Sequence, residues 1–170
     1  TAFLEESREL LRMAAGGGAE LDVWPEPGAP VCRVDAGQLR QVLMNLVRNA
    51  AEADRGRAAR VRVSCGPFTR TELGAFPVLH DHLPDDAGDG LLAFGVEDDG
   101  PGLDEEALQQ VFDPFYSTKP SGHGLGLAAA LGIVRANGGA VALRSRAPRG
   151  LSFRIAFPAL RGRDEIGRAH

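Results

Sequence analysis

Two asparagines lie one helical turn apart in a segment that otherwise predicts an amphipathic helix. Apolar residues recur there at intervals of three and four from Leu39 to Ala53, and Asp35 stands ahead of them at the N-cap position. Asparagine is a weak helix former, so Asn45 and Asn49 cost helical stability unless their side chains have a function. Amide oxygens at this spacing suit a hard cation such as Mg²⁺. The alternative is that both amides hydrogen-bond only to local backbone or solvent.

An acidic, glycine-rich turn follows directly on a predicted buried strand at residues 91–96. Asp98 opens this turn, and Gly100 and Gly102 follow it. A carboxylate at a strand end can accept a hydrogen bond from an exocyclic amine, and glycines let a flat base approach the backbone. An acidic turn without a ligand has the same composition. The turn is therefore either a base-binding site or an ordinary strand end.

A second glycine run immediately precedes a predicted helix at residues 127–136. Its members are Gly122, His123, Gly124, Leu125 and Gly126. Free backbone N–H groups at a helix N-terminus form a cradle for phosphate, strengthened by the helix dipole. The run matches neither the P-loop nor the dinucleotide-binding fingerprint. It predicts either a phosphate site or a flexible hinge.

The chain has one lysine among its 19 basic residues, and this lysine lies between the two glycine runs. Lys119 ends the stretch FDPFYSTK, which begins at Phe112. Lysine is a compact charge that suits a polyphosphate. The alternative is an exposed loop lysine with no ligand.

Helices and strands alternate irregularly along the chain. Helices are predicted over residues 2–13, 35–54, 105–111 and 127–136, and strands over 21–24, 31–34, 60–64, 91–96, 141–145 and 151–157. Residues 66–89, which hold three prolines and three glycines, predict a long hairpin loop or insertion, with His80 and Asp81 as loop residues. Without regular βαβ alternation, the pattern predicts an α+β fold.

The composition is that of one soluble globular domain of 170 residues, with 44% hydrophobic and 25% charged residues. A net charge of −4 argues against nonspecific nucleic-acid binding. The apolar runs fall far short of the roughly 18 residues that span a membrane. Two unpaired cysteines favour neither a disulfide scaffold nor a zinc site. We expect a domain over residues 1–158 and a tail or linker over 159–170, in a fragment of a larger protein.

The order of these motifs resembles the N, G1, F and G2 boxes of the ATP-binding catalytic domains of bacterial sensor histidine kinases. The resemblance extends from about residue 35 to residue 158 and includes Gly138-Gly139 and the final RGLSF stretch at 149–153. It implies a two-layer α/β sandwich, in which helices cover one face of a mixed sheet. Gyrase, a heat-shock chaperone and mismatch-repair ATPases share that fold.

The resemblance also implies roles for individual residues in binding ATP. Asn49 would hold Mg²⁺, and Asn45 would assist at the triphosphate. Asp98 would bind the adenine amino group, while Gly100 and Gly102 would shape the adenine pocket.

The phosphate end of the implied site belongs to a lid over residues 103–122 and to the glycine run that follows it. Residues 122–126, including His123 and Leu125, would meet the phosphates. Lys119 would reach the γ-phosphate, and with Asn45 and Asn49 it would complete a set of three catalytic residues. Phe112 and Phe115 would pack at the hinge of the lid.

The activity implied by the resemblance is transfer of the ATP γ-phosphoryl group to a histidine. That histidine would lie on a dimerisation domain absent from this chain, so the chain alone would bind ATP with little turnover. The implied whole protein is a homodimer that serves a response regulator and uses no nucleic acid. Its catalytic domain would be cytoplasmic, and the parent protein soluble or membrane-anchored.

Three other functions fit parts of the pattern. An ATP-gated binding module or ATPase clamp of the same superfamily usually has glutamate where Asn45 stands. A serine kinase of the anti-sigma type generally lacks the aromatic stretch that begins at Phe112. A degenerate scaffold without nucleotide would not need the complete set of glycines.

Overall fold

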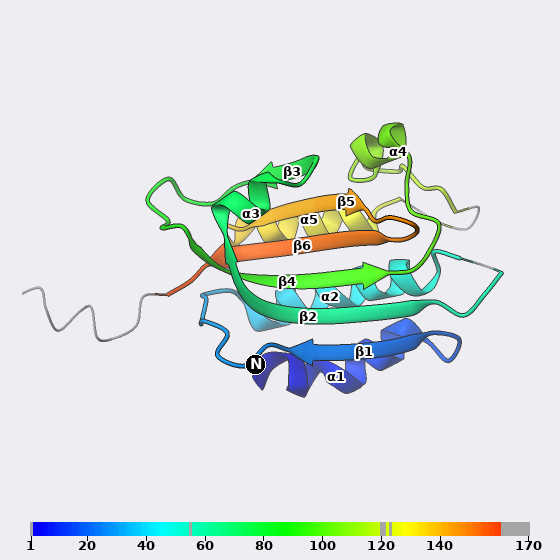
Figure 1. Cartoon of the computed structure of the whole chain (residues 1–170), viewed down its shortest axis with the longest axis horizontal. Coiled ribbons are helices and arrows are strands. Elements are labelled where there is room, and N and C mark those ends of the chain that lie inside the picture. The colour runs from blue at the N-terminus through cyan, green and yellow to red at the C-terminus, as the bar shows by residue number, and fades with distance from the viewer. Residues whose placement is uncertain (1, 55, 120–121, 123, 161–170) are drawn as a thin grey trace, which may run out of the picture.

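The structure, a computed structural model, describes residues 2–54, 56–119, 122 and 124–160. Within these residues one mixed sheet has the strand order β1-β2-β4-β6-β5-β3 (Figure 1). Its strands are β1 (Glu20–Pro25), β2 (Arg60–Thr69), β3 (Val78–Asp81), β4 (Gly90–Asp98), β5 (Ala140–Ser145) and β6 (Leu151–Pro158). The pair β1–β2 is parallel, and the other pairs are antiparallel.

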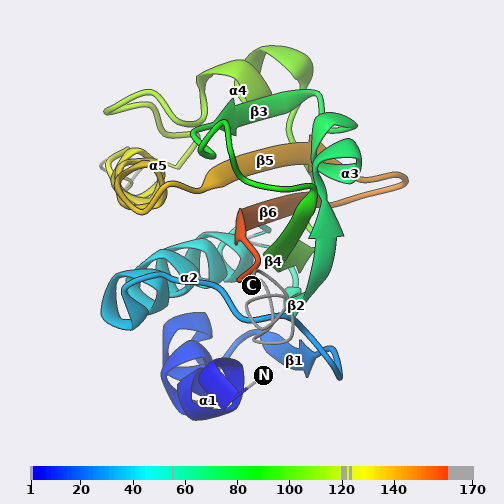
Figure 2. The same cartoon turned by 90° about the vertical axis from the view of Figure 1, so that its left-hand side faces the viewer.

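Three helices, α1 (Ala2–Ala15), α2 (Ala36–Ala51) and α5 (Gly126–Ala136), cover one face of the sheet (Figure 2). The main core lies between them and the sheet, where Leu43 and Val47 of α2 are fully buried with Phe94 of β4. The apolar stripe on α2 explains this, because one helical face must leave water. The predicted α+β sandwich with helices on one face is confirmed.

Helix α2 begins where the sequence predicts. The Asp35 side chain accepts a hydrogen bond from the Gln38 backbone N–H, at 2.8 Å. This cap satisfies one of the N–H groups that a helix start leaves without a partner. The cap sets the register that places Asn45 and Asn49.

Residues 66–89 hold more structure than predicted: residues 66–69 belong to β2 and pair with β4, and residues 70–89 form the hairpin connection. The segment contains α3 (Arg70–Gly74) and β3. A capping box between Thr69 and Glu72 starts α3. The interpretation of His80 and Asp81 as loop residues is wrong, because both lie in β3, which pairs with β5.

Helix α3 packs on the sheet face opposite α2. Leu73 is buried there with Leu91 and Ala93 of β4, whereas Leu92 and Phe94 belong to the core under α2. Alternate residues of a strand point to opposite faces, so β4 is buried on both sides along this stretch.

The predicted strand at residues 31–34 is wrong. Only one bridge forms there, between Cys32 and Ala159. The segment is too short to extend a ladder before Asp35 caps α2. Of the predicted tail, residues 161–170 lie outside the described residues.

In the part of the chain that the structure describes, the longest helix, α2, has 16 residues. No helix there combines the length and hydropathy needed to cross a bilayer.

Candidate functional site

A cavity of about 1230 Å³ lies where the C-terminal half of α2 faces the end of β4 and the segment beyond it. The short helix α4 (Glu105–Gln110), the loop that follows it, the start of α5 and two residues of β6, Leu151 and Phe153, also line it. This exceeds the roughly 300–1,000 Å³ of most small-molecule sites. Eight of the residues singled out by sequence line it: Asn49, Asp98, Gly102, Lys119, Gly122, Gly124, Leu125 and Gly126.

Three of the residues predicted to bind ATP are not among the described residues that line the cavity. Asn45 is half-buried one turn before Asn49 on α2. Gly100 lies in the turn after β4, where its backbone N–H donates to Asp98. His123 lies outside the described residues.

Asp98 ends β4 as a buried carboxylate, with 5% of its surface exposed. Its Oδ1 accepts a hydrogen bond of 2.8 Å from the Gly100 N–H. Burial raises the pKa of Asp98, although hydrogen bonding by the backbone N–H groups of Gly100 and Leu151 opposes the rise. Because a buried carboxylate needs partners, Asp98 is suited to accept hydrogen bonds from a ligand in the cavity.

The glycines of this turn are required by close packing. A Cβ on Gly100 would come within 2.9 Å of the Ala53 Cβ, two residues past the end of α2. Gly102 has a φ of +75°, and a Cβ there would come within 3.0 Å of the Gly150 carbonyl. The turn therefore fits tightly between α2 and the β5–β6 hairpin.

Asn49 offers a hard oxygen ligand from the α2 wall of the cavity. It is half-buried, and no other residue in the described ranges hydrogen-bonds to its side-chain amide. Those same ranges hold no cluster of three His, Cys, Asp or Glu residues that could bind a metal. A single amide oxygen that lines the cavity fits a Mg²⁺ ion whose other ligands come from a bound phosphate and water.

An ion pair links the two sides of the cavity. Lys119 Nζ lies 3.0 Å from Oε2 of Glu52, the residue that caps the C-terminus of α2. Both residues line the cavity. The one lysine of the chain is thus directed toward α2, next to the turn that carries Asn49.

Gly124 and Gly126 have different structural roles. Gly124 has a φ of +68°, and a Cβ there would lie 2.3 Å from the Phe115 carbonyl carbon. The Gly124 carbonyl also accepts the Phe115 N–H at 2.9 Å. Gly126 begins α5, and a Cβ there would meet no atom within 4 Å. Packing requires the first glycine and leaves open space at the second.

The prediction that both phenylalanines pack at the lid hinge is wrong for Phe115 and confirmed for Phe112. Phe112 is 6% exposed and packs edge-on against His80 and Phe153, with ring centroids 5.0 and 6.2 Å away. Phe115 is 77% exposed and has a φ of +67°. The left-handed backbone at Phe115 turns its ring to solvent, so only Phe112 packs.

Sequence reasoning missed a set of arginines around the turn after β4. Arg57 pairs with the Asp99 carboxylate, which also accepts the Arg60 backbone N–H. Arg149 pairs with Asp54 at 2.6 Å. These partners are separated by dozens of residues, so no local spacing pattern connects them.

Comparison with known proteins places this geometry in a family. Residues 34–161 match the family described as "Histidine kinase-, DNA gyrase B-, and HSP90-like ATPase". The chain is 35% identical over 164 residues to "Sensory histidine kinase/phosphatase NtrB" of Rhizobium meliloti (strain 1021), covering 95% of the chain and 41% of that relative. It is 32% identical over 169 residues to "Sensor kinase CckA" of Brucella abortus (strain 2308), covering 94% of the chain and 16% of that relative. The chain thus spans less than half the length of either relative.

Solved structures show the same architecture. Full-length ShkA in complex with AMPPNP matches with a TM-score of 0.70 and 26% identity, over 95% of this chain and 30% of that one. The mycobacterial sensor histidine kinase MprB matches with a TM-score of 0.64 and 25% identity, over 93% of both chains. The family match covers the whole cavity and most of the chain. The chain therefore belongs to the histidine kinase-, DNA gyrase B- and HSP90-like ATPase family, as a catalytic domain of the sensor histidine kinase type.

Proposed function

We propose that this chain binds ATP with Mg²⁺ in the cavity and donates the γ-phosphoryl group to a histidine on a separate helical hairpin. One observation carries the proposal: the buried carboxylate of Asp98 lines the same cavity as Asn49, Lys119 and the glycine run. The site thus combines a group suited to a base with groups suited to a triphosphate. ShkA, a structural neighbour, is in complex with AMPPNP, an ATP analogue.

Asp98 is the adenine-binding group in this proposal. Its carboxylate accepts a hydrogen bond from the exocyclic amine, while the Gly100 N–H keeps the other acceptor position occupied. Gly102, with its positive φ, keeps the backbone close to the base. The buried position excludes water from this contact and strengthens it.

Asn49 and Lys119 act at the triphosphate. The Asn49 amide oxygen would hold Mg²⁺, which when bound would supply neutralisation of phosphate charge. Lys119 leaves Glu52 and donates to the γ-phosphate, and the N–H groups at the start of α5 face the phosphate oxygens. Asn45, one turn earlier on α2, supports this end of the site.

The transfer itself needs positioning more than covalent chemistry from this chain. The bond from the γ-phosphorus to its bridging oxygen breaks, a bond to an imidazole nitrogen of the acceptor forms, and ADP leaves. The segment 103–122 closes over the nucleotide and keeps water from competing with the acceptor.

The partners follow from the relatives named as sensor kinases. We propose a dimerising hairpin that bears the acceptor histidine, a homodimeric whole protein and a response regulator that receives the phosphoryl group. The domain acts in the cytoplasm, whether the whole protein is soluble or membrane-anchored.

Phosphoryl transfer can be tested by mixing the chain with a purified helical hairpin that carries an acceptor histidine and with ATP labelled at the γ-phosphate. We expect label on the hairpin, lost when Asp98→Ala or Asn49→Ala replaces the wild type and retained in Glu9→Gln, an exposed control on α1. Release of labelled inorganic phosphate with an unlabelled hairpin would contradict transfer and favour an ATPase clamp.

A further inference from the structure

The backbone of Asp98 lies just past the end of the β4–β6 ladder. The last pair of that ladder is Glu97 with Ser152, so Asp98 is one residue beyond it. The turn of the β5–β6 hairpin lies next to this point. Within that turn, the Arg146 N–H donates to the Gly150 carbonyl at 2.9 Å. A Cβ on Gly150 would lie 2.1 Å from the Asp98 carbonyl oxygen. The hairpin therefore packs directly on the backbone of Asp98.

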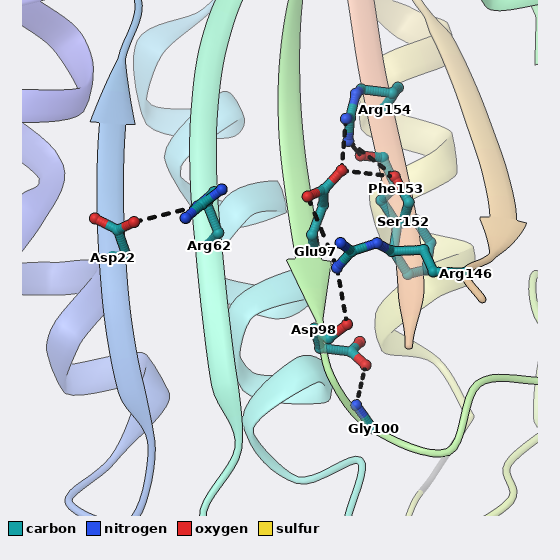
Figure 3. A network of polar contacts seen from close by, with 9 residues as sticks. All are labelled: Asp22, Arg62, Glu97, Asp98, Gly100, Arg146, Ser152, Phe153 and Arg154. Carbon is teal, nitrogen blue, oxygen red and sulfur yellow. Dashed lines mark hydrogen bonds and ion pairs between the residues drawn. The ribbon is translucent and has the colours of Figure 1, made fainter. Parts of the chain in front are cut away.

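One guanidinium contacts two consecutive residues of β4. Arg146 Nη1 donates to the Asp98 carbonyl oxygen at 3.3 Å and lies 3.8 Å from Glu97 Oε2 (Figure 3). Both contacts come from the same guanidinium nitrogen, which carries two N–H donors and part of the positive charge, so this one group reaches a carbonyl and a carboxylate. Arg146 thus links the main chain of Asp98 to the Glu97 carboxylate, which lies on the sheet face opposite the Asp98 side chain.

Glu97 is itself held in place. Arg154 Nη2 donates to its Oε1 at 2.7 Å, and the Ser152 hydroxyl donates to the same oxygen at 3.3 Å. The Glu97 side chain is only 18% exposed. Arg146 therefore pairs with a carboxylate whose position two residues of β6 already determine.

We propose that Arg146 is a positioning residue for base recognition, acting on Asp98 through its carbonyl from outside the cavity. The inference rests on the proposed role of Asp98 in binding adenine. A recognition group must be held to within about 0.5 Å to discriminate between ligands. Loss of Arg146 therefore weakens the contact with the exocyclic amine and leaves the triphosphate contacts in place.

The test compares ATP with ITP, whose base carries an oxo group where adenine has the amine. Dissociation constants are measured by displacement of trinitrophenyl-ATP from wild type, Arg146→Met and Arg146→Lys. Arg62→Met is the matched control, because Arg62 lies on the same sheet face and pairs with Asp22 at 3.2 Å. The residue paired with Arg62 on β4 is Glu97, so Arg62 lies beside the contacts that Glu97 makes with Arg146 and Arg154.

We expect Arg146→Met to raise the dissociation constant for ATP about tenfold and that for ITP less than about twofold. Arg146→Lys recovers part of the ATP affinity, and Arg62→Met changes neither constant. An unchanged ATP constant in Arg146→Met, or equal weakening of ATP and ITP, would overturn the proposal. If Arg146→Met does not fold, Arg146→Lys carries the same comparison with a smaller expected change.

A second measurement requires no nucleotide. The Gly100 amide, which donates to Asp98 Oδ1, reports the position of that carboxylate in an NMR spectrum of the chain. We expect its resonance to shift in Arg146→Met or Arg146→Lys and to stay in place in Arg62→Met; an unshifted resonance would overturn the positioning role. Wild type that binds no ATP would instead overturn the proposed function, while this spectrum still decides whether Arg146 positions Asp98.

Discussion

Glu97 and Asp98 are consecutive residues of β4 whose carboxyl groups lie on opposite faces of the sheet and have pKa values shifted in opposite directions. Burial raises the pKa of Asp98. Burial also acts to raise the pKa of Glu97, but Arg154, Arg146 and Ser152 together lower it. The Glu97 carboxylate is paired with arginine and stabilises the fold. The Asp98 carboxylate has no such ion pair with a described residue, so its charge costs stability, and it can accept hydrogen bonds from a ligand.

Asp98→Asn should stabilise the protein while weakening ATP binding. Because the folded-state pKa of Asp98 is raised, its ionisation destabilises the fold as pH rises from the ordinary value of 3.8 through the folded value. The asparagine Oδ1 can still accept the Gly100 N–H. We expect a gain on the order of 1 kcal/mol in the free energy of unfolding at pH 7. The gain should vanish below the ordinary pKa in urea titrations across pH.

Glu97→Gln is the matched substitution with the opposite sign. The folded-state pKa of Glu97 is lowered, so its carboxylate contributes stability above the ordinary value of 4.5, and this is lost as pH falls through the folded value. We expect a loss of about 1–3 kcal/mol at neutral pH. Destabilisation by Asp98→Asn at pH 7, in the same urea series, would contradict the account of both residues.

Glu52→Gln should strengthen ATP binding. In the proposed site Lys119 must leave Glu52 to reach the γ-phosphate, so removing the carboxylate frees the ammonium and lowers repulsion at the triphosphate. The pair is partly exposed, which limits the expected gain in affinity to about fivefold. Glu9→Gln changes the net charge equally at an exposed position on α1 and serves as the control. Weaker ATP binding in Glu52→Gln would instead show that Glu52 holds Lys119 in its working position.

Alanine at the two glycines 124 and 126 should have different effects. Gly124→Ala introduces a Cβ into the Phe115 backbone at a positive φ, and we expect it to destabilise the protein by about 1–3 kcal/mol. Gly126→Ala enters open space at the start of α5 and should leave the unfolding temperature unchanged or higher. In the proposed site the backbone at Gly126 contacts phosphate, so Gly126→Ala should lose ATP affinity although its stability is unchanged. Equal thermal stability of the two variants would be inconsistent with the geometry.

Substitutions of Phe112 and Phe115 should have different effects on the stability of the protein. Phe112→Ala removes a buried ring that contacts His80 and Phe153, and should cost about 3 kcal/mol. Phe115→Gly removes an exposed ring and relieves a positive φ, so it should be neutral or stabilising by up to about 1 kcal/mol. Thermal unfolding of both variants tests this, and a large loss in Phe115→Gly would mean that its ring packs.

Local patterns predicted the elements that depend on local interactions. The apolar periodicity and the Asp35 cap predict α2, and the structure confirms both. A continuous apolar run at residues 91–96 predicts a buried strand, and the structure confirms β4, which is buried on both faces. Asp98 was found because it stands just after that apolar run, at the end of β4.

Features that depend on distant partners were not predictable in this way. Strand β3 exists because His80 pairs with Val141, about sixty residues later. Arg146 approaches Asp98 only because the β5–β6 hairpin meets the end of β4. The backbone turn at Phe115 depends on its hydrogen bond to Gly124. Each of these requires the folded topology, which spacing along the chain does not encode.

Calorimetric titration of ATP, with and without Mg²⁺, into wild type, Asp98→Ala and Asn49→Ala tests the central claim most directly. We expect wild type to bind, Asp98→Ala to lose binding in both conditions, and Asn49→Ala to lose mainly the dependence on Mg²⁺. No heat of binding from wild type at millimolar nucleotide, or full affinity in Asp98→Ala, would contradict the assignment of this cavity as an ATP site.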